Sequence, residues 1–223
     1  MARTWLITGC STGFGKALAS EVAVRGERVV ATARNVASLA YLDRYDNALA
    51  VALDVTDKAA IENAVAAAND RFGGVDVLVN NAGFGLRGAV EEASDAEIAG
   101  VFGTNFFGPI NLIKAVLPGM RENRSGTIVN FSSIAAFRTA EGSGYYGATK
   151  AALEAASDAL AKEVAPLGIR VMVVEPGPFR TDFAGRSLSV AALDIADYAE
   201  TAGKRKQRND PHAEWRLGSP EKA

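Results

Sequence analysis

The chain has 223 residues, 48% of them hydrophobic and 22% charged, with a net charge of -2 at pH 7. One α/β domain can account for this length, and the charge gives no reason to expect nucleic acid as a partner. With Cys10 as its only cysteine, the chain can form no intrachain disulfide and no cysteine-based metal cluster. The single histidine, His212, argues against a Ser-His-Asp hydrolase and a histidine-rich zinc site, so we expect no metal.

No apolar run approaches the ~20 residues that a membrane span needs. The opening stretch MARTWLITG is too short and too soon interrupted to be a signal peptide. We therefore expect a cytoplasmic protein with no membrane partner.

Six short apolar runs, rich in valine, isoleucine and leucine, alternate with longer amphipathic segments. Runs that are apolar on both faces are typical of buried parallel strands. The predicted strands are residues 4–8, 28–33, 48–53, 75–80, 126–132 and 169–176. The predicted helices are residues 14–25, 36–45, 57–71, 95–118 and 146–166. This alternation predicts an α/β, doubly wound Rossmann fold, with a parallel sheet of order 3-2-1-4-5-6 and helices on both faces.

The pattern changes after Pro176. We expect a single domain over residues 1–203, which includes a substrate loop at about 177–203, where residues 182–202 could form one or two amphipathic helices. Residues 204–223 form a polar C-terminal segment with no strand signal. Its basic cluster KRKQR is expected to be solvated and mobile.

The stretch TGCSTGFG (8–15) follows the first strand and opens the first helix. Gly9, Gly13 and Gly15 allow a tight turn and a close approach of the backbone to a ligand, and the helix N-terminus offers free N–H groups to a phosphate. At the end of the second strand, Ala33 and Arg34 stand where an acidic residue would accept the ribose 2′-hydroxyl of NAD. An arginine can bind a 2′-phosphate through two parallel hydrogen bonds, which favours NADP(H) over NAD(H).

A tyrosine and a lysine with helical spacing follow the fifth strand, in SGYYGATK (143–150). Positions i and i+4 lie on one face of a helix, so Tyr146 pairs with Lys150, while Tyr145 pairs with Thr149. A half-buried tyrosine beside a surface lysine is the alternative interpretation of this motif taken alone.

Taken together, seven motifs resemble the short-chain dehydrogenase/reductase family over about residues 3 to 185. In chain order they are T-G-x-x-x-G-x-G (8–15), LDV (53–55), NNAG (80–83), TNFFG (104–108), NFSS (130–133), YGATK (146–150) and EPGPFRT (175–181). The Y-x-x-x-K spacing is similar to that of dehydrogenases and ketoreductases rather than enoyl reductases. With Arg34, the NADP-preferring branch is the better match.

The resemblance implies roles for residues at the matching positions. The catalytic tetrad corresponds to Asn105, Ser133, Tyr146 and Lys150. The residues implied to bind the cofactor are Gly9, Ser11, Thr12, Gly13, Phe14, Gly15, Arg34, Asp54, Val55, Asn81, Ala82, Gly83, Tyr146, Lys150, Pro176, Gly177 and Thr181. Within this set, Asp54 is implied to hold the adenine amino group, and Asn80 to open the motif that stabilises the central strand.

The implied activity is hydride transfer between NADP(H) and a carbonyl or alcohol. In this chemistry Tyr146 gives or takes the proton, and Lys150 lowers the pKa of the phenol. Ser133 is expected to hydrogen-bond the substrate oxygen, and Asn105 to hold a water that links Lys150 to solvent. A regulator that binds NADP(H) without turnover, and an isomerase or dehydratase on the same scaffold, remain alternatives.

Aromatic and aliphatic residues in the loops after strands four, five and six suggest an apolar ketone or alcohol substrate. They are Phe84, Leu86, Phe137, Phe179 and Phe183. The first motifs look similar to those of retinol and hydroxysteroid dehydrogenases and of many bacterial reductases.

Family members usually have a further helix and a seventh strand, and nothing after Ala184 here reads as a strand. The strand at 169–176 would then lie at an exposed edge of the sheet, which invites pairing with another chain. We expect that residues 1–223 are a shortened form of a longer protein. The resemblance implies a homodimer or homotetramer.

Overall fold

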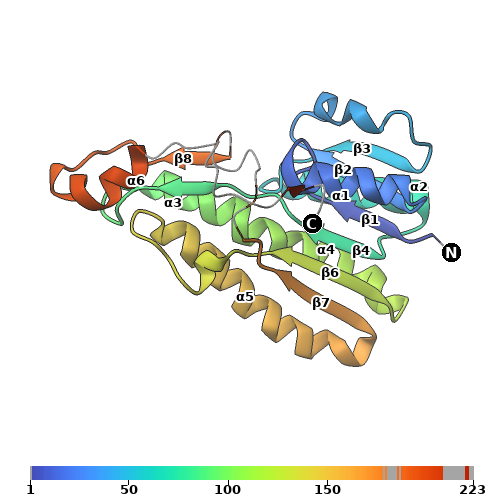
Figure 1. Ribbon diagram of the computed structural model, residues 1–223. Helices are drawn as coiled ribbons and strands as arrows, with labels where there is room; N and C mark the ends of the chain where they lie inside the picture. The colour runs from blue at the N-terminus through green and yellow to red at the C-terminus, as the bar shows by residue number, and fades with distance from the viewer. Residues whose placement is uncertain (1, 178, 180–184, 186, 208–218, 221–223) are drawn as a thin grey trace.

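The computed structural model describes residues 2–177, 179, 185, 187–207 and 219–220 (Figure 1). Six strands form the main sheet: β1 (Thr4–Ile7), β2 (Arg28–Ala33), β3 (Ala48–Ala52), β4 (Val77–Asn80), β6 (Gly126–Phe131) and β7 (Ile169–Val174). All their pairings are parallel, in the order β3-β2-β1-β4-β6-β7. Counted along the chain these are strands one to six, so the predicted order 3-2-1-4-5-6 and the Rossmann fold are confirmed.

Helices cover both faces of this sheet. On one face lie α1 (Gly13–Val24) and the short 3-10 helix η1 (Val36–Leu42), and on the other lie α2 (Lys58–Phe72), α4 (Gly108–Glu122) and α5 (Gly144–Val164). Neighbouring strand residues alternate between the two cores: Ile7 packs with α1, whereas Leu6 packs with α2 and α4. Because both faces are buried, the strands read as continuous apolar runs.

The single helix predicted for residues 95–118 consists of three pieces. α3 (Asp95–Phe102) begins at a capping box, in which Ser94 accepts from the Glu97 backbone and the Glu97 carboxylate accepts from the Ser94 backbone. A π-helical stretch, η2 (Gly103–Phe107), separates α3 from α4. Such stretches are frequent at functional sites, and this one carries the buried Asn105.

A second sheet, which the sequence did not predict, lies beyond the carboxyl ends of the main strands (Figure 1). It pairs β5 (Gly85–Arg87) with β8 (Leu188–Val190) in parallel. The expectation that no strand follows Ala184 is therefore wrong. The helices expected over 182–202 are also only partly present, as η6 (Ala196–Tyr198) and η7 (Ala199–Gly203), while 182–184 and 186 lie outside the described residues.

The basic cluster starts as a short helix, α6 (Lys204–Gln207), in which Lys204 and Gln207 are exposed, as expected, but Lys206 is not. The Lys206 ammonium lies 3.2 Å from a Glu92 carboxylate oxygen and 3.1 Å from one of Asp194. The side chains of Lys206 and Glu92 are only 9% and 0% exposed. Glu92 also accepts from the backbone of Ile195 and Ala89, and these bonds keep its pKa below the usual range. The expectation of a mobile cluster is therefore wrong for Lys206. The sequence could not show this, because its acidic partner Glu92 lies in a distant part of the chain.

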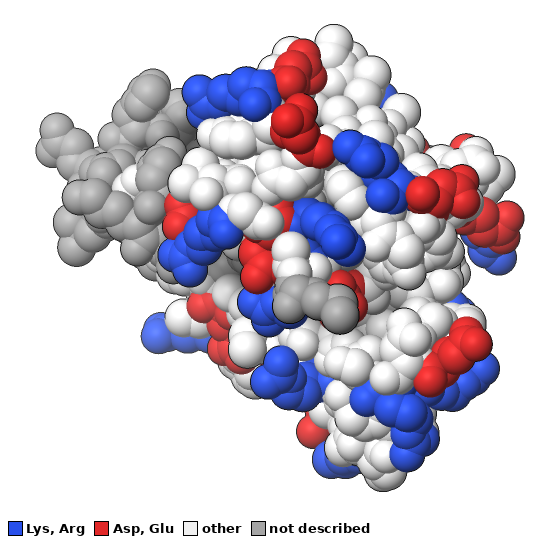
Figure 2. Space-filling view, turned by 90° about the vertical axis from the view of Figure 1, so that its right-hand side faces the viewer, with Lys and Arg blue, Asp and Glu red and all other residues white. Residues whose placement is uncertain are grey.

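Figure 2 shows the end of the molecule at which β1 begins, with acidic and basic side chains interspersed among the described residues of this face. Within the described ranges, no helix combines the length and apolarity needed to cross a bilayer. The same residues contain no group of three or more histidine, cysteine or acidic side chains that could hold a metal ion.

Candidate active site

The turn between β1 and α1 is built so that only glycine fits at two of its positions. Gly9 has φ +72°, and a Cβ on Gly15 would lie 2.3 Å from the Gly9 carbonyl oxygen. The Asn81 side chain holds this turn by donating to the carbonyls of Thr8 (2.8 Å) and Gly9 (3.2 Å). The turn therefore brings bare backbone and the N-terminus of α1 to the edge of a cavity.

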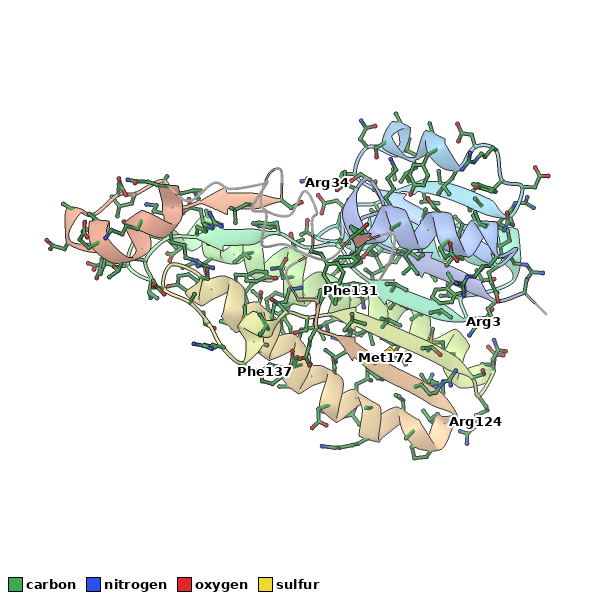
Figure 3. The ribbon with its side chains drawn as sticks, in the orientation of Figure 1. Arg3, Arg34, Arg124, Phe131, Phe137 and Met172 are labelled. Carbon is green, nitrogen blue, oxygen red and sulfur yellow. The ribbon has the colours of Figure 1, made fainter. Side chains whose placement is uncertain are left out.

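That cavity, called here the groove, has a volume of about 530 Å³ and follows the carboxyl ends of the first four strands. It is lined by eleven of the predicted cofactor residues: Gly9, Ser11, Thr12, Gly13, Phe14, Arg34, Asp54, Val55, Asn81, Ala82 and Gly83. Figure 3 shows Arg34 near one end of the strands of the sheet, and Arg3 and Arg124 near the other end.

Asp54 keeps its negative charge in the groove. The backbone N–H of Thr56 (2.9 Å) and its hydroxyl (2.7 Å) both donate to one Asp54 carboxylate oxygen. These two bonds, and then the charge of Arg34, hold the pKa of Asp54 below its usual value. Asp54 is thus an ionised acceptor at neutral pH, at one side of the groove.

A second cavity, called here the pocket, has a volume of about 440 Å³ and is lined by Ser133, Tyr146 and Lys150. Helix α5 supplies the tyrosine and the lysine, one turn apart, as the i, i+4 spacing predicted. Lys150 donates to the Phe131 carbonyl oxygen at 2.7 Å, and its ammonium lies 5.8 Å from the centre of the Tyr146 ring. Ser133 caps the short helix η3 (Ile134–Ala136) and lies close enough to the Tyr146 phenol to influence its pKa.

Burial shifts the pKa of both titratable groups in this pocket. It raises the pKa of Tyr146, although the nearby Ser133 hydroxyl acts in the opposite direction. It lowers the pKa of Lys150 to about 8, because an ammonium is disfavoured away from water. The lowered tyrosine pKa expected from the lysine is thus not found in this structure, where desolvation of the phenolate is the largest effect.

Asn105 is the fourth member of the predicted tetrad, and it is 1% exposed. Its amide oxygen accepts from the Phe84 backbone N–H at 3.0 Å, and its amide nitrogen donates to the Phe84 carbonyl at 2.8 Å and to the Thr149 hydroxyl at 3.2 Å. The side chain therefore fixes the loop after β4 against α5, directly beside Lys150.

The groove and the pocket are adjoining cavities. Phe14, Asn81 and Gly83 line both of them. A long ligand in the groove can therefore reach the wall of the pocket that carries Tyr146.

The family model described as short chain dehydrogenase matches residues 3–190. The chain belongs to the short-chain dehydrogenase family. Members of this family are oxidoreductases that act on alcohol and ketone groups and bind a nicotinamide cofactor.

Similar proteins include enzymes of several substrate classes. A 3-ketodihydrosphingosine reductase of Bacteroides thetaiotaomicron is 40% identical over 197 residues, which are 88% of this chain and 71% of that one. Human retinol dehydrogenase 8 is 40% identical over 205 residues, which are 89% of this chain and 65% of that one. A solved short-chain dehydrogenase from Streptomyces avermitilis is 43% identical with a TM-score of 0.90, covering 99% of this chain and 80% of that one.

In this short-chain dehydrogenase, the residues predicted to contact substrate do not all lie together. Leu86 and Phe179 line the pocket, as do Pro176 and Gly177. Phe84 lines the groove instead, and Phe137 is 70% exposed and is not among the described lining residues of either cavity (Figure 3). Thr181 and Phe183 lie outside the described residues.

Sequence reasoning missed several groups of the site. The pocket is also lined by Arg87, Arg138 and Arg205, which come from three separate segments. Behind the pocket, Asn80 donates to Asn130 (2.8 Å) and Asn130 donates to Ser157 (2.8 Å), which ties β4, β6 and α5 together in the core. Asn130 and Ser157 lie within an apolar strand and in the middle of a helix, so no local pattern separates them from ordinary polar residues.

Proposed function

We propose that the chain transfers a hydride between NADP(H) and a carbonyl compound or its alcohol. The observation that carries this proposal is the junction of the two cavities, where the groove opens beside Ser133, Tyr146 and Lys150. The groove fits an extended dinucleotide: bare glycine backbone stands at one point, and ionised Asp54 and Arg34 stand at another. When bound, the cofactor supplies the hydride that reaches the carbonyl carbon.

In the direction of reduction, Tyr146 gives its phenolic proton to the carbonyl oxygen, so that ketone, reduced cofactor and one proton become alcohol and oxidised cofactor. Ser133 orients the carbonyl oxygen toward Tyr146, because both side chains line the pocket. Lys150 stabilises the phenolate left on Tyr146 and returns a proton to it. Asn105 is a positioning residue that holds the loop at Phe84 and the Thr149 hydroxyl.

A panel of ketones and alcohols, followed at the absorbance band of the reduced nicotinamide, tests this function. We expect net oxidation of NADPH with ketones and net reduction of NADP⁺ with alcohols. A protein that binds the cofactor but turns over none of these compounds would be a sensor. An isomerase or dehydratase would convert substrate without net change in this absorbance. Either result would contradict the proposal.

The preference for NADP(H) is proposed to depend on Arg34, which is exposed and lines the groove. Losing a hydrogen bond to a charged group typically costs about 1.5–3 kcal/mol, or about 10- to 150-fold in affinity. Arg34→Ala is expected to weaken the binding of NADP(H) by that factor and to leave the binding of NAD(H) almost unchanged. Fluorescence titration measures both affinities. Arg44→Ala is the matched control, since Arg44 stacks on Tyr45 and does not line the groove. Equal losses for both cofactors would mean that the 2′-phosphate is bound elsewhere.

We also propose that the chain forms a homodimer or homotetramer. Two features support this: Phe107, the last residue of η2, is 54% exposed, and Met172, on the edge strand β7, is 56% exposed. Light scattering is expected to give a mass of two or four times the 23.3 kDa of the chain. A particle with the mass of one chain would contradict the proposal.

A further inference from the structure

The pocket carries positive charge that the hydride-transfer chemistry does not use. The described residues that line it include Arg87, Arg138 and Arg205 in addition to Lys150. No acidic residue is among these described lining residues. We propose that this pocket selects substrates that bear an anionic group, a carboxylate or a phosphate ester, close to the reacting carbonyl. This inference rests on the proposed function, because it places the anion in the same pocket as Tyr146.

The three arginines come from segments far apart in the sequence. Arg87 ends β5, Arg138 follows η3, and Arg205 lies in α6. The Arg87 guanidinium donates to the Arg205 carbonyl at 3.1 Å, and the Nε of Arg205 donates to the Ser143 hydroxyl at 3.2 Å. The fold therefore holds Arg87 against Arg205 at the wall of the pocket, and Arg138 lines the same pocket from a third segment.

Helix α6 is held in a way that directs Arg205 to the pocket. Its neighbour Lys206 is pinned between Glu92 and Asp194 and is almost fully buried. Successive residues of a helix point about 100° apart, so the residue before Lys206 faces a different direction. The acidic residues thus neutralise Lys206, whereas no described acidic residue lies within 4.0 Å of the Arg205 guanidinium.

Arg138 has donors available for a ligand. Its guanidinium has no hydrogen bond or ion pair with any described residue, although it lines the pocket. The planar fork of an arginine matches the two oxygens of a carboxylate or phosphate. Several cations in one cavity also repel one another, and a bound anion relieves that repulsion.

The anion is expected to bind near the reacting carbonyl. Ser143, which Arg205 contacts, precedes Tyr146 by three residues, or about one helical turn of ~5 Å. Phe14, Phe131, Phe179 and Leu86 contribute to the apolar part of the lining. The substrate class that fits is an oxo compound with a short spacer to its charged group and an apolar remainder. This refines the apolar ketone expected from the sequence.

Paired probes test the charge requirement. The carboxylate pair is 4-oxopentanoate and its methyl ester, and the phosphate pair is hydroxyacetone phosphate and hydroxyacetone. With NADPH, we expect kcat/KM for the charged member of at least one pair to exceed that of its neutral partner by tenfold or more. The pair that shows the preference identifies the anion.

Variants then locate the preference. Arg138→Met and Arg205→Met are each expected to lower the charged-to-neutral ratio of kcat/KM by at least fivefold, mainly through KM, and Arg205→Lys to restore part of it. Arg121→Met, at an exposed position of α4 outside both cavities, is the matched control and should leave the ratio unchanged. Two results would overturn the anion site: a charged-to-neutral ratio near one in the wild type, or arginine variants that lower kcat/KM equally for both members of a pair. Neither result would contradict the proposed hydride transfer.

Calorimetric titration of the same probes into protein saturated with oxidised cofactor separates binding from turnover. If a charged probe binds more tightly than its neutral partner, and Arg205→Met removes this difference, the anion site is supported. If in addition no probe is reduced, the result contradicts the proposed function but not the anion site. Equal binding of charged and neutral probes, or no binding of either, overturns the anion site.

Discussion

Tyr146→Phe is expected to lower kcat by about 10³-fold while the cofactor dissociation constant stays within about twofold. The change removes one oxygen from the wall of the pocket, which Ser133 also lines. A positioned general acid or base typically contributes 10²- to 10⁴-fold to the rate. Because the phenol acts on the substrate oxygen, its loss leaves the groove intact. Steady-state rates and cofactor titration measure the two quantities.

Tyr145→Phe is the matched control for this prediction. Tyr145 is the preceding residue of α5, and its hydroxyl donates to the Val90 carbonyl at 3.2 Å, away from Lys150. We expect a change in kcat of less than threefold. If Tyr146→Phe kept a tenth or more of the activity, or if both variants lost the same amount, the phenol of Tyr146 would not be the proton donor.

The main sheet could be predicted because its determinants are local. Strands such as 28–33 and 126–132 are apolar on both faces, and β2 (Arg28–Ala33) and β6 (Gly126–Phe131) occupy nearly the same residues. The pairing of Tyr146 with Lys150 follows from the helical repeat, and the glycine turn follows from its place between a strand and a helix. Each of these features is visible within a window of a few residues.

The second sheet and the site that it frames could not be predicted in this way. Strands β5 (Gly85–Arg87) and β8 (Leu188–Val190) have three residues each, too few to show an alternating pattern, and they pair across about a hundred residues of chain. The break at η2 (Gly103–Phe107) was not predicted either, and the sequence pattern predicts one helix over residues 95–118. Lys206 was predicted to be solvated, because the basic cluster KRKQR by itself does not show that Glu92 is its partner.

Gly15→Ala is expected to weaken cofactor binding by at least tenfold and to lower the melting temperature. The added Cβ would lie 2.3 Å from the Gly9 carbonyl oxygen and 2.5 Å from the Asn81 amide nitrogen, and real Cβ atoms essentially never come within 3.0 Å of another heavy atom. The oxygen is backbone, and Asn81 holds it by a hydrogen bond, so neither neighbour can move without opening the turn. Overpacking of this kind typically costs about 1–3 kcal/mol.

Gly119→Ala is the control that separates this clash from the general effect of alanine in a helix. Gly119 lies in α4 with no atom within 4 Å of the added Cβ, so alanine there should stabilise the fold by about 0.5–1 kcal/mol through reduced backbone freedom of the unfolded chain. Thermal unfolding is therefore expected to show a lower melting temperature for Gly15→Ala and a higher one for Gly119→Ala. Cofactor titration is expected to show weaker binding for Gly15→Ala only. If Gly15→Ala bound cofactor as tightly as the wild type, the turn would not form the phosphate-binding end of the groove, and the ligand would have to lie elsewhere along the strand ends.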